Sequence, residues 1–236
     1  MLIAGDTIID WIIKDGKVDV AVGGVGNLVR GLKKKGHDPK LLTLYNPMLY
    51  PLSYVMPLHE NSLTDFNHRN VFVRDYDRGV YQRFRENLRK NVFDVSGAFA
   101  VVCHEDSVIR KFDSFYADVR DTSVSGKCVV LRMSSSDDYE AIMEKVSHLV
   151  AIVTFKDKVK IMSKLDYETT RGGVWHTVEF QTVDAVDDIG AGDTFNVGFL
   201  DYIDRHGYKL RFELVNAIKA GIDLAQEKVQ KIGVFM

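Results

Sequence analysis

Short apolar runs alternate with helix-like segments through the second half of the chain, and this order constrains the fold more than any other feature. An apolar run from Ala98 to Cys103 precedes a segment near Asp106 to Phe112 that we expect to be helical. Further apolar runs follow at Phe115 to Val119 and Cys128 to Arg132. This alternation predicts an α/β fold with a largely parallel sheet. Ligands in such folds bind at the carboxyl ends of the strands.

The C-terminal segments continue the same order. We expect a helix from Asp137 to His148, followed by strands at Leu149 to Phe155, Val159 to Met162 and Thr177 to Val183. Two helices follow. The first has Phe195, Phe199 and Ile203 on one face and ends at Gly207, and the second runs from Phe212 to Lys231. The chain therefore closes with a pair of helices that have apolar faces.

The N-terminal part is richer in strands. We expect strands at Leu2 to Ala4, Ile8 to Ile13, Val18 to Val22 and Leu41 to Tyr45, a tight turn at Asp15-Gly16, and a helix from Asn27 to Lys35 that stops at Gly36. Prolines interrupt residues 46 to 69, where no element is predicted. Val71 to Arg74 and Val80 to Phe84 flank a turn and predict a hairpin.

The composition restricts the expected number of domains, the expected partners and the expected location of the protein. A chain of 236 residues with 46% hydrophobic residues is long enough for one domain that spans residues 1 to 236. The net charge of -2 provides no general basic field, so nucleic acid is not the expected partner. No run approaches the ~20 apolar residues that span a membrane. Cys103 and Cys128 lie in strand-like runs and fit reduced structural thiols, so we expect a cytoplasmic protein.

The segment Gly190-Ala191-Gly192-Asp193 joins an acidic loop to an apolar-faced helix. Small residues let backbone amides approach an anion, and the first N–H groups of a helix have no partners within it. The segment thus predicts a phosphate-sized anion site with the Asp193 carboxylate beside it. That position suits a base that deprotonates an attacking hydroxyl.

Residues 187 to 195, Asp-Asp-Ile-Gly-Ala-Gly-Asp-Thr-Phe, resemble the C-terminal signature of the ribokinase-like (PfkB) carbohydrate kinases. The resemblance implies a three-layer α/β sandwich with a mostly parallel central sheet and a small β lid. It also implies that Gly190, Ala191 and Gly192 form an anion hole and that Asp193 is the catalytic base. The implied reaction transfers the γ-phosphate of ATP, with Mg²⁺, to a hydroxyl of a sugar, sugar phosphate or nucleoside.

The N-terminus resembles the same family. Gly5-Asp6 with Asp10 a few residues later is similar to its first element, and Gly23-Gly24-Val25-Gly26-Asn27 is similar to the Gly-Gly-x-x-x-Asn that opens its first long helix, with one residue fewer before the asparagine. The resemblance implies that Asp10, Gly24 and Asn27 contact substrate hydroxyls. Carboxylate and amide groups suit a polyhydroxylated ligand.

The predicted hairpin fits the lid of this family. Together with residues 10 to 22, residues 70 to 85 would form a lid that covers the substrate and pairs two subunits in a homodimer. Its sequence resembles the lid of the bacterial heptose-phosphate kinases, which implies that Arg74 or Arg83 holds a substrate phosphate. Arginines on a solvated strand edge are the alternative.

The resemblance places the nucleotide along the Gly190 turn, near Thr154, Lys156, Asp187 and Asn216. Two family elements are changed. The Asn-x-x-Glu that organises Mg²⁺ is replaced by residues 132 to 138, Arg-Met-Ser-Ser-Ser-Asp-Asp, where Asp137 or Asp138 would be the substitute. The usual Thr-Leu-Gly-x-x-Gly reads Thr-Phe-Lys-Asp-Lys-Val from residue 154.

Other interpretations remain open at this stage. A relative of this fold that binds ligands without catalysis would tolerate the changed elements, and Asp193 would then only complement the helix dipole. Gly24-Val25-Gly26 between a strand and a helix also fits an NAD-dependent oxidoreductase, although Val29 stands where that fingerprint needs a small residue. Asp10 and Asn27 also fit turn and cap residues.

Overall fold

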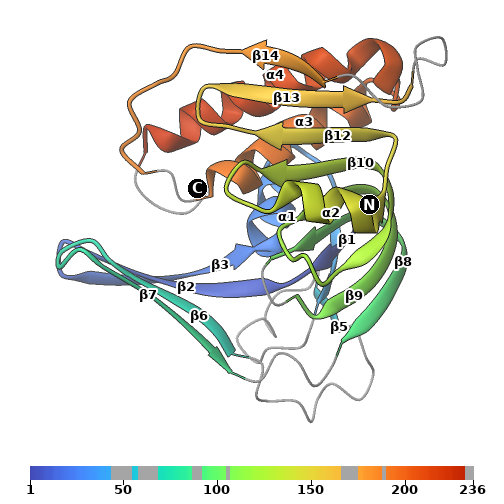
Figure 1. Cartoon of the computed structure of the whole chain (residues 1–236). Coiled ribbons are helices and arrows are strands. Elements are labelled where there is room, and N and C mark those ends of the chain that lie inside the picture. The colour runs from blue at the N-terminus through green and yellow to red at the C-terminus, as the bar shows by residue number, and fades with distance from the viewer. Residues whose placement is uncertain are drawn as a thin grey trace.

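The computed structural model describes residues 1–43, 55–57, 69–86, 92–104, 107–165, 175–187 and 190–231. Within these residues the strands form a large ten-stranded sheet and a separate four-stranded sheet. Helices pack on the large sheet, and the small sheet extends away from it (Figure 1). The chain thus consists of an α/β body and a projecting β lid.

The elements of the body are listed here in chain order. They are β1 (Leu2–Gly5), α1 (Val25–Lys34), β4 (Lys40–Thr43), β5 (Val55–Pro57), β8 (Phe93–Cys103), β9 (Ile109–Val119), β10 (Ser125–Ser134), α2 (Tyr139–Lys145), β11 (Val146–Ser147), β12 (Val150–Thr154), β13 (Lys158–Ser163), β14 (Trp175–Glu179), α3 (Ala191–Arg205) and α4 (Leu210–Val229).

The large sheet is mostly parallel. Its strand order is β14-β13-β12-β10-β9-β8-β1-β4-β5, with β11 paired to β10. Neighbours are parallel from β12 through β5, whereas β13 pairs antiparallel with both β12 and β14. The carboxyl ends of β1, β8, β9, β10 and β12 therefore meet at one edge, which confirms the sheet that the alternating pattern predicted.

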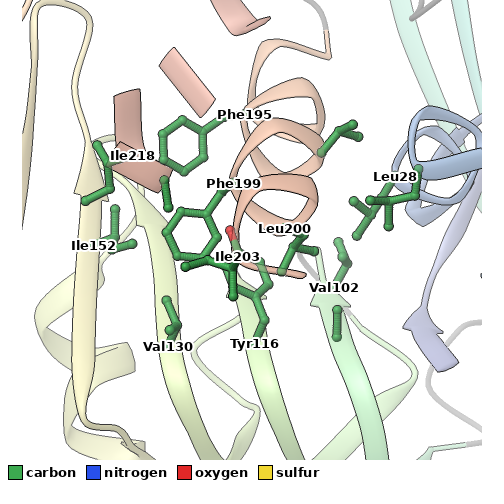
Figure 2. Close-up of a cluster of buried hydrophobic side chains, with 14 of the residues drawn as sticks. Leu28, Val102, Tyr116, Val130, Ile152, Phe195, Phe199, Leu200, Ile203 and Ile218 are labelled. Carbon is green, nitrogen blue, oxygen red and sulfur yellow. The ribbon is translucent and has the colours of Figure 1, made fainter. Parts of the chain in front are cut away.

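Consecutive residues of the parallel strands pack on opposite faces of the sheet. Tyr116 and Val130 belong to a core cluster that also contains Phe199 of α3 (Figure 2). Their chain neighbours Ala117 and Leu131 belong to a second cluster on the other face. Because both faces are buried, these strands read in the sequence as nearly continuous apolar runs.

Helices cover both faces. The first cluster contains side chains of α1, α3 and α4, and the second contains Ile142 of α2. Glycines allow a close approach of α3 and α4, since a Cβ at Gly198 would lie 2.5 Å from the Ala220 carbonyl oxygen. The result is a three-layer arrangement with the sheet between the helices, as predicted.

The lid consists of β2 (Thr7–Lys14), β3 (Lys17–Gly24), β6 (Arg69–Asp75) and β7 (Val80–Glu86), in the order β3-β2-β6-β7. Residues 10 to 22 and 70 to 85 thus lie in this one small sheet and its turns. The predicted turn is present, with positive φ at both Asp15 (52°) and Gly16 (69°). Two such residues suit a tight hairpin because the twist of the turn matches that of the strands.

One predicted helix is wrong. Of these residues the structure describes 107 to 112, and they do not form a helix: β9 begins at Ile109 and pairs with β8 and β10. Two exposed residues separate the buried Ile109 and Phe112, so apolar residues three apart on a strand imitate helical spacing. From Phe112 onward, buried residues alternate with more exposed ones through Ser114 and Tyr116, which is the period of a strand.

Two other elements are shorter than predicted. Asp138 caps α2 by accepting a hydrogen bond from the Ala141 amide at 3.2 Å, and the helix ends where Val146 enters β11. The predicted strand from Thr177 to Val183 appears as β14, which ends at Glu179. The predicted strand end at Tyr45 lies outside the described residues. Among the described helices, none has both the length and the apolar character needed to cross a lipid bilayer.

Candidate active site

The Gly190 turn begins α3. Gly190 is the N-cap of α3 and has a left-handed backbone with φ 78°. A left-handed residue at this point favours glycine because a side chain would be strained. The amides of the first turn, from Ala191 to Asp193, precede the hydrogen-bonded part of the helix, where the helix dipole is positive. Asp188 and Ile189 of the motif lie outside the described residues.

Asp193 points into the protein from the first turn of α3. Only 7% of the residue is exposed, and its Oδ2 accepts a hydrogen bond from Asn27 Nδ2 at 2.9 Å. Asn27 is itself oriented, because Arg30 Nη2 donates to its Oδ1 at 2.7 Å. Two motifs that are 166 residues apart therefore meet at one carboxylate.

The environment of Asp193 raises its proton affinity. Burial raises the pKa of this carboxyl from 3.8 to about 6, although the hydrogen bond from Asn27 and the charge of Arg120 favour the ionised form. A base works best with a pKa near the operating pH. Asp193 is therefore ionised at neutral pH and still basic enough to take a proton.

A small cavity of about 300 Å³ lies in front of Asp193. It is lined by residues of the lid, α1 and the Gly190 turn, among them Asp10, Gly24, Asn27, Gly190 and Asp193. Gly24 has φ 59°, and a Cβ there would lie 2.6 Å from the Asp6 carbonyl oxygen. The structure thus brings together the residues that the N-terminal and C-terminal motifs indicated.

Asp10 reaches this cavity because two neighbours accommodate it. A Cβ at Gly23 would lie 2.0 Å from Asp10 Oδ2, so glycine leaves the space that the carboxylate fills. Arg74 Nε donates to Asp10 Oδ1 at 3.3 Å from the adjacent lid strand. Arg74 therefore orients and neutralises Asp10. Arg83 lies in β7 opposite Phe72, and its side chain is outside the described part of the structure.

A larger cavity of about 950 Å³ lies on the other side of the Gly190 turn. Its polar end contains Arg120, Arg132, Ser134, Thr154 and Lys156, and its apolar end contains Phe180, Val183, Val186, Ala225 and Val229. Of the predicted nucleotide contacts, Thr154, Lys156 and Asp187 line it. The cavity thus offers cationic and apolar surfaces to one ligand.

Asn216 does not belong to this cavity. Its exposed side chain donates from Nδ2 to Glu213 Oε2 at 3.0 Å on α4. The helical period places Asn216 on the outer face of α4, whereas Ile222, Ala225 and Val229 of the same helix line the cavity. A nucleotide contact for Asn216 is therefore not supported.

Arg120 lies beside the Gly190 turn, although no sequence motif indicated it. This side chain lines both the small and the large cavity, and its Nε is buried with no hydrogen-bond partner among the described residues. A Cβ at Gly192 would lie 3.0 Å from Arg120 Nη2 and 3.1 Å from Arg132 Nη1. Glycine at position 192 therefore lets two guanidinium groups approach the start of α3.

A buried polar network holds Arg132 in place. Its Nη1 donates to Asp118 Oδ2 at 2.9 Å, and its Nη2 donates to Thr154 Oγ1 at 2.7 Å. Asn196 Nδ2 also donates to Asp118 Oδ2, at 2.6 Å. Burial opposes ionisation of Asp118, but the charges of Arg132 and Arg120 outweigh it and lower the pKa of this carboxyl. Arg132 is thus fixed beside the turn before any ligand binds.

Asp187 connects the lid to the loop before the turn. Its Oδ2 accepts a hydrogen bond from the Tyr76 hydroxyl at 2.8 Å, and Lys228 Nζ lies 3.8 Å from the same oxygen. Burial and the hydrogen bond to Asp187 raise the pKa of Tyr76, so its hydroxyl remains a donor. The predicted role of Asp187 in nucleotide binding stays a prediction; its observed contacts are with protein groups.

The acidic residues predicted for metal binding differ in position. Asp138 is exposed and caps α2. Asp137 is partly buried near the arginine pair, and its Oδ2 accepts a hydrogen bond from the Ser134 amide at 2.7 Å. No cluster of three or more potential metal ligands occurs in the described part of the chain. Asp137 is not among the residues that line the large cavity, whereas Ser134, Ser135 and Thr154 line it with hydroxyl groups.

A mainly parallel sheet between helices, a separate β lid and a glycine turn at the start of α3 together define the ribokinase-like fold. Solved structures confirm this class. A fructokinase from Xylella fastidiosa with bound ATP matches with TM-score 0.66 and 12% identity, over 100% of this chain and 93% of its own.

Two further kinases show the same fold. Ribokinase from Thermotoga maritima matches with TM-score 0.63 and 15% identity, over 99% of this chain and 94% of its own. Aminoimidazole riboside kinase from Salmonella enterica matches with TM-score 0.58 and 12% identity, over 100% and 95%. No protein-family model matches the sequence, and no curated protein sequence matches it. The likeness therefore lies in the fold.

Proposed function

We propose that this chain is a phosphotransferase that moves the γ-phosphate of ATP to a hydroxyl group of a sugar or nucleoside. One observation carries the proposal: the buried Asp193 carboxylate lies at the start of α3, held by Asn27 at 2.9 Å, between a small polar cavity and a large cavity with a cationic end. A base, an anion site and two ligand cavities thus share one helix terminus.

The reaction requires a proton transfer and one displacement. Asp193 accepts the proton of the acceptor hydroxyl, and the acceptor oxygen forms a bond to the γ-phosphorus as the bond from that phosphorus to the bridging oxygen of ADP breaks. The amides of the Gly190 turn face the charge on the transferred group. Arg120, which lines both cavities, supplies a positive charge at the same place.

The large cavity suits ATP as donor. Its cationic end, with Arg120, Arg132 and Lys156, would hold the phosphates, and its apolar end, with Val186 and Val229, would cover the base. Because the described residues contain no cluster of three or more potential metal ligands, Mg²⁺ would be held mainly by the phosphates, with Asp137 as the predicted protein ligand, and it would neutralise phosphate charge there. The changed motif at residues 132 to 138 thus replaces acidic ligands with a fixed arginine.

The small cavity favours a small, hydroxyl-rich acceptor. Its volume of about 300 Å³ is at the lower end of ligand pockets. Asp10 and Asn27 offer acceptors and donors for hydroxyl groups. Arg74 already pairs with Asp10, so a phosphate on the acceptor would have to compete for it. Gly24 lines this same small cavity, which leaves little room for the dinucleotide of an oxidoreductase.

A ligand-binding relative without catalysis is the second candidate, favoured by the absence of an acidic cluster among the described residues. A coupled assay of ATP turnover decides between the two. Wild type and Asp193→Asn are tested with a panel of sugars, sugar phosphates and nucleosides. Turnover that the substitution abolishes supports the kinase. Ligand-induced thermal shifts without turnover for any acceptor support the binder, and a shift with nicotinamide nucleotides alone supports the oxidoreductase.

We further propose a homodimer that pairs through the lid, and a cytoplasmic location. The lid face opposite Asp10 carries the exposed side chains of Trp11, Val18 and Val20, which an identical face of a second copy would cover. The buried free thiols of Cys103 and Cys128 fit a reducing compartment in which ATP is available.

A further inference from the structure

Lys228 is a buried cation without a role in the reaction described above. It lies in the last turn of α4, and only 5% of its side chain is exposed. Its Nζ donates to the carbonyl oxygen of Asp187 at 3.1 Å and to that of Lys231 at 3.5 Å. The Asp187 carboxylate, 2% exposed, adds a negative charge at 3.8 Å. The ammonium group therefore sits among oxygen atoms of the loop before the Gly190 turn and of the end of α4.

The position of this ammonium relates it to the anion site. A Cβ at Gly190 would lie 4.0 Å from Lys228 Cε and 3.9 Å from Asn27 Nδ2. The same loop is tied to α4 by the amides of Val186 and Asp187, which both donate to the Val229 carbonyl oxygen, at 2.8 and 3.0 Å. Lys228 thus adds a further contact between the end of α4 and the loop that leads to the turn at the start of α3.

The oxygen atoms around Lys228 Nζ are of the kind that bind a monovalent cation: one backbone carbonyl oxygen lies at 3.1 Å, a second at 3.5 Å and a carboxylate oxygen at 3.8 Å. Backbone carbonyl and carboxylate oxygens are the ligands that hard cations take in proteins, and carbonyl oxygens in particular replace the water around K⁺. An ammonium group has the same single charge and donates hydrogen bonds to the same oxygens. The covalent stem fixes the charge in place without a requirement for free ion.

We propose that Lys228 is a built-in monovalent cation: its Nζ fills an oxygen-lined site beside the Gly190 turn that would otherwise take K⁺ or NH₄⁺. Its charge holds Asp187 and the preceding loop in the shape that presents the turn amides to an anion. Lys228 is a positioning residue, since it acts through the turn. This role rests on the proposed phosphotransferase function, but occupancy of the site does not.

Two substitutions test the proposal with opposite expectations. Lys228→Ala removes the charge and leaves room for an ion, so K⁺ or NH₄⁺ should restore what is lost. Lys228→Met removes the charge but keeps a side chain of similar length, so neither ion should restore it. Lys219→Ala, at an exposed position of the same helix, is the control and should behave as wild type in every salt.

The measurements are the midpoint of thermal unfolding and the rate of ATP turnover, in NaCl, KCl and NH₄Cl at constant ionic strength. We expect wild type to be indifferent to the choice of salt. Lys228→Ala should lose about tenfold in turnover in NaCl, the usual effect of removing a group that orients a charged site. Both its turnover and its unfolding midpoint should rise with KCl or NH₄Cl until the site is saturated.

Two results would overturn the proposal. One is a saturable response of wild type to K⁺ in the unfolding midpoint, which would show that an ion site remains open beside Lys228. The other is a Lys228→Ala protein that folds and yet gains nothing from either ion in either measurement. The salt response of wild type needs no variant, and the unfolding midpoint needs no activity. The proposal about Lys228 can therefore be tested even if the protein shows no kinase turnover.

Discussion

Asp193, the proposed base, is also a side chain whose ionised form destabilises the folded protein. Its burial raises the pKa from 3.8 to about 6, which means that the ionised form present at neutral pH is unfavourable in the folded protein. Between these two values the folded protein binds more protons than the unfolded chain. Its stability therefore falls as the pH rises through this window and stays lower above it.

We predict that Asp193→Asn abolishes turnover and stabilises the fold. The difference between the two pKa values corresponds to roughly 3 kcal/mol in the free energy of unfolding at pH 7, as an upper limit. The amide oxygen can still accept the hydrogen bond from Asn27. Urea unfolding at pH 7 and at pH 4 measures the effect, which should shrink at pH 4. Asp223→Asn, on the exposed side of α4, should change neither property. A destabilised Asp193→Asn protein at pH 7 would contradict the account of burial.

The same carboxyl predicts the pH dependence of the reaction. The base must be ionised, so turnover should be constant at pH 7 to 8 and fall as the pH drops through about 6, about tenfold for each further pH unit. A profile of kcat/KM against pH measures this in the free enzyme. A profile that stays flat down to pH 5 would exclude Asp193 as the base.

At the residue scale, the sequence motifs indicated residues that lie together in the structure. Asp193, Asn27 and Asp10 meet in one cavity, and only the resemblance to a kinase family pointed to this long-range contact. Arg120 was missed because its place depends on the ends of strands whose pairing local patterns do not reveal. The available signal was a charged residue directly after an apolar strand, at the edge where ligands of α/β sheets bind.

At the scale of elements, β9 and β10 contain two cross-strand ion pairs that differ strongly in burial. Asp118 pairs with Arg132 and Asp113 with Lys127, each directly opposite in the parallel ladder. The first pair is 4% or less exposed, whereas the side chains of the second are 69% and 49% exposed. Their comparison separates the effect of burial from that of pairing.

We predict that Arg132→Met lowers the free energy of unfolding by about 3 to 5 kcal/mol, because it leaves the Asp118 carboxylate buried without its ion-pair partner. Lys127→Met should lower it by less than about 1 kcal/mol, since solvent screens an exposed pair. Urea unfolding of both variants provides the measurement. Equal losses would mean that the buried network does not have the strength assigned to it here.

The link between lid and body is also an element-scale feature. Tyr76, in the turn between β6 and β7, donates to Asp187, and Tyr76→Phe removes this hydrogen bond to a buried carboxylate. A bond to a charged group contributes about 1.5 to 3 kcal/mol. We therefore expect the KM for ATP to rise about tenfold or more. Tyr139→Phe, on α2 and outside the lining of the large cavity, should leave KM unchanged. Equal KM values for the two variants would argue against a coupled lid.

The boundaries of elements were predicted well where the periodicity of apolar residues agreed with the position of turn residues. The hairpin at Asp15-Gly16 and the helix that ends before Gly36 are examples. The helix predicted near Asp106 to Phe112 failed because polar residues on a strand with uneven burial imitate helical spacing. Burial depends on neighbouring strands, and one segment does not contain that information.

At the scale of the whole molecule, the exposed apolar face of the lid predicts a homodimer. Trp11 is 41% exposed and lies opposite Val20 on the face away from the small cavity. Trp11→Glu would place a charge in a paired apolar face, so we expect a dimer in the wild type and a monomer in this variant. Sedimentation equilibrium measures both. Phe212→Glu, at a 77% exposed position on α4, is the matched control and should remain dimeric. A monomeric wild type would exclude pairing through the lid.

The N-terminal and C-terminal parts of the chain both contribute residues to the small cavity. The lid and α1 provide Asp10 and Asn27, and the start of α3 provides Asp193, so the small cavity exists only when the N-terminal and C-terminal segments are folded together. Layer order and parallel pairing were predictable from the alternation of strands and helices. The closeness of the cavities to one carboxylate was not, because it depends on how α1 and α3 pack against each other.

The transfer of labelled phosphate tests the central claim most directly. Protein is incubated with ATP labelled at the γ-phosphate and with a pool of sugars and nucleosides, and the labelled products are separated. The account predicts a labelled acceptor with wild type and with Asp223→Asn, and none with Asp193→Asn. Label that reaches an acceptor equally well with Asp193→Asn, or that wild type releases only as inorganic phosphate, would contradict a base at Asp193 that acts on an acceptor hydroxyl.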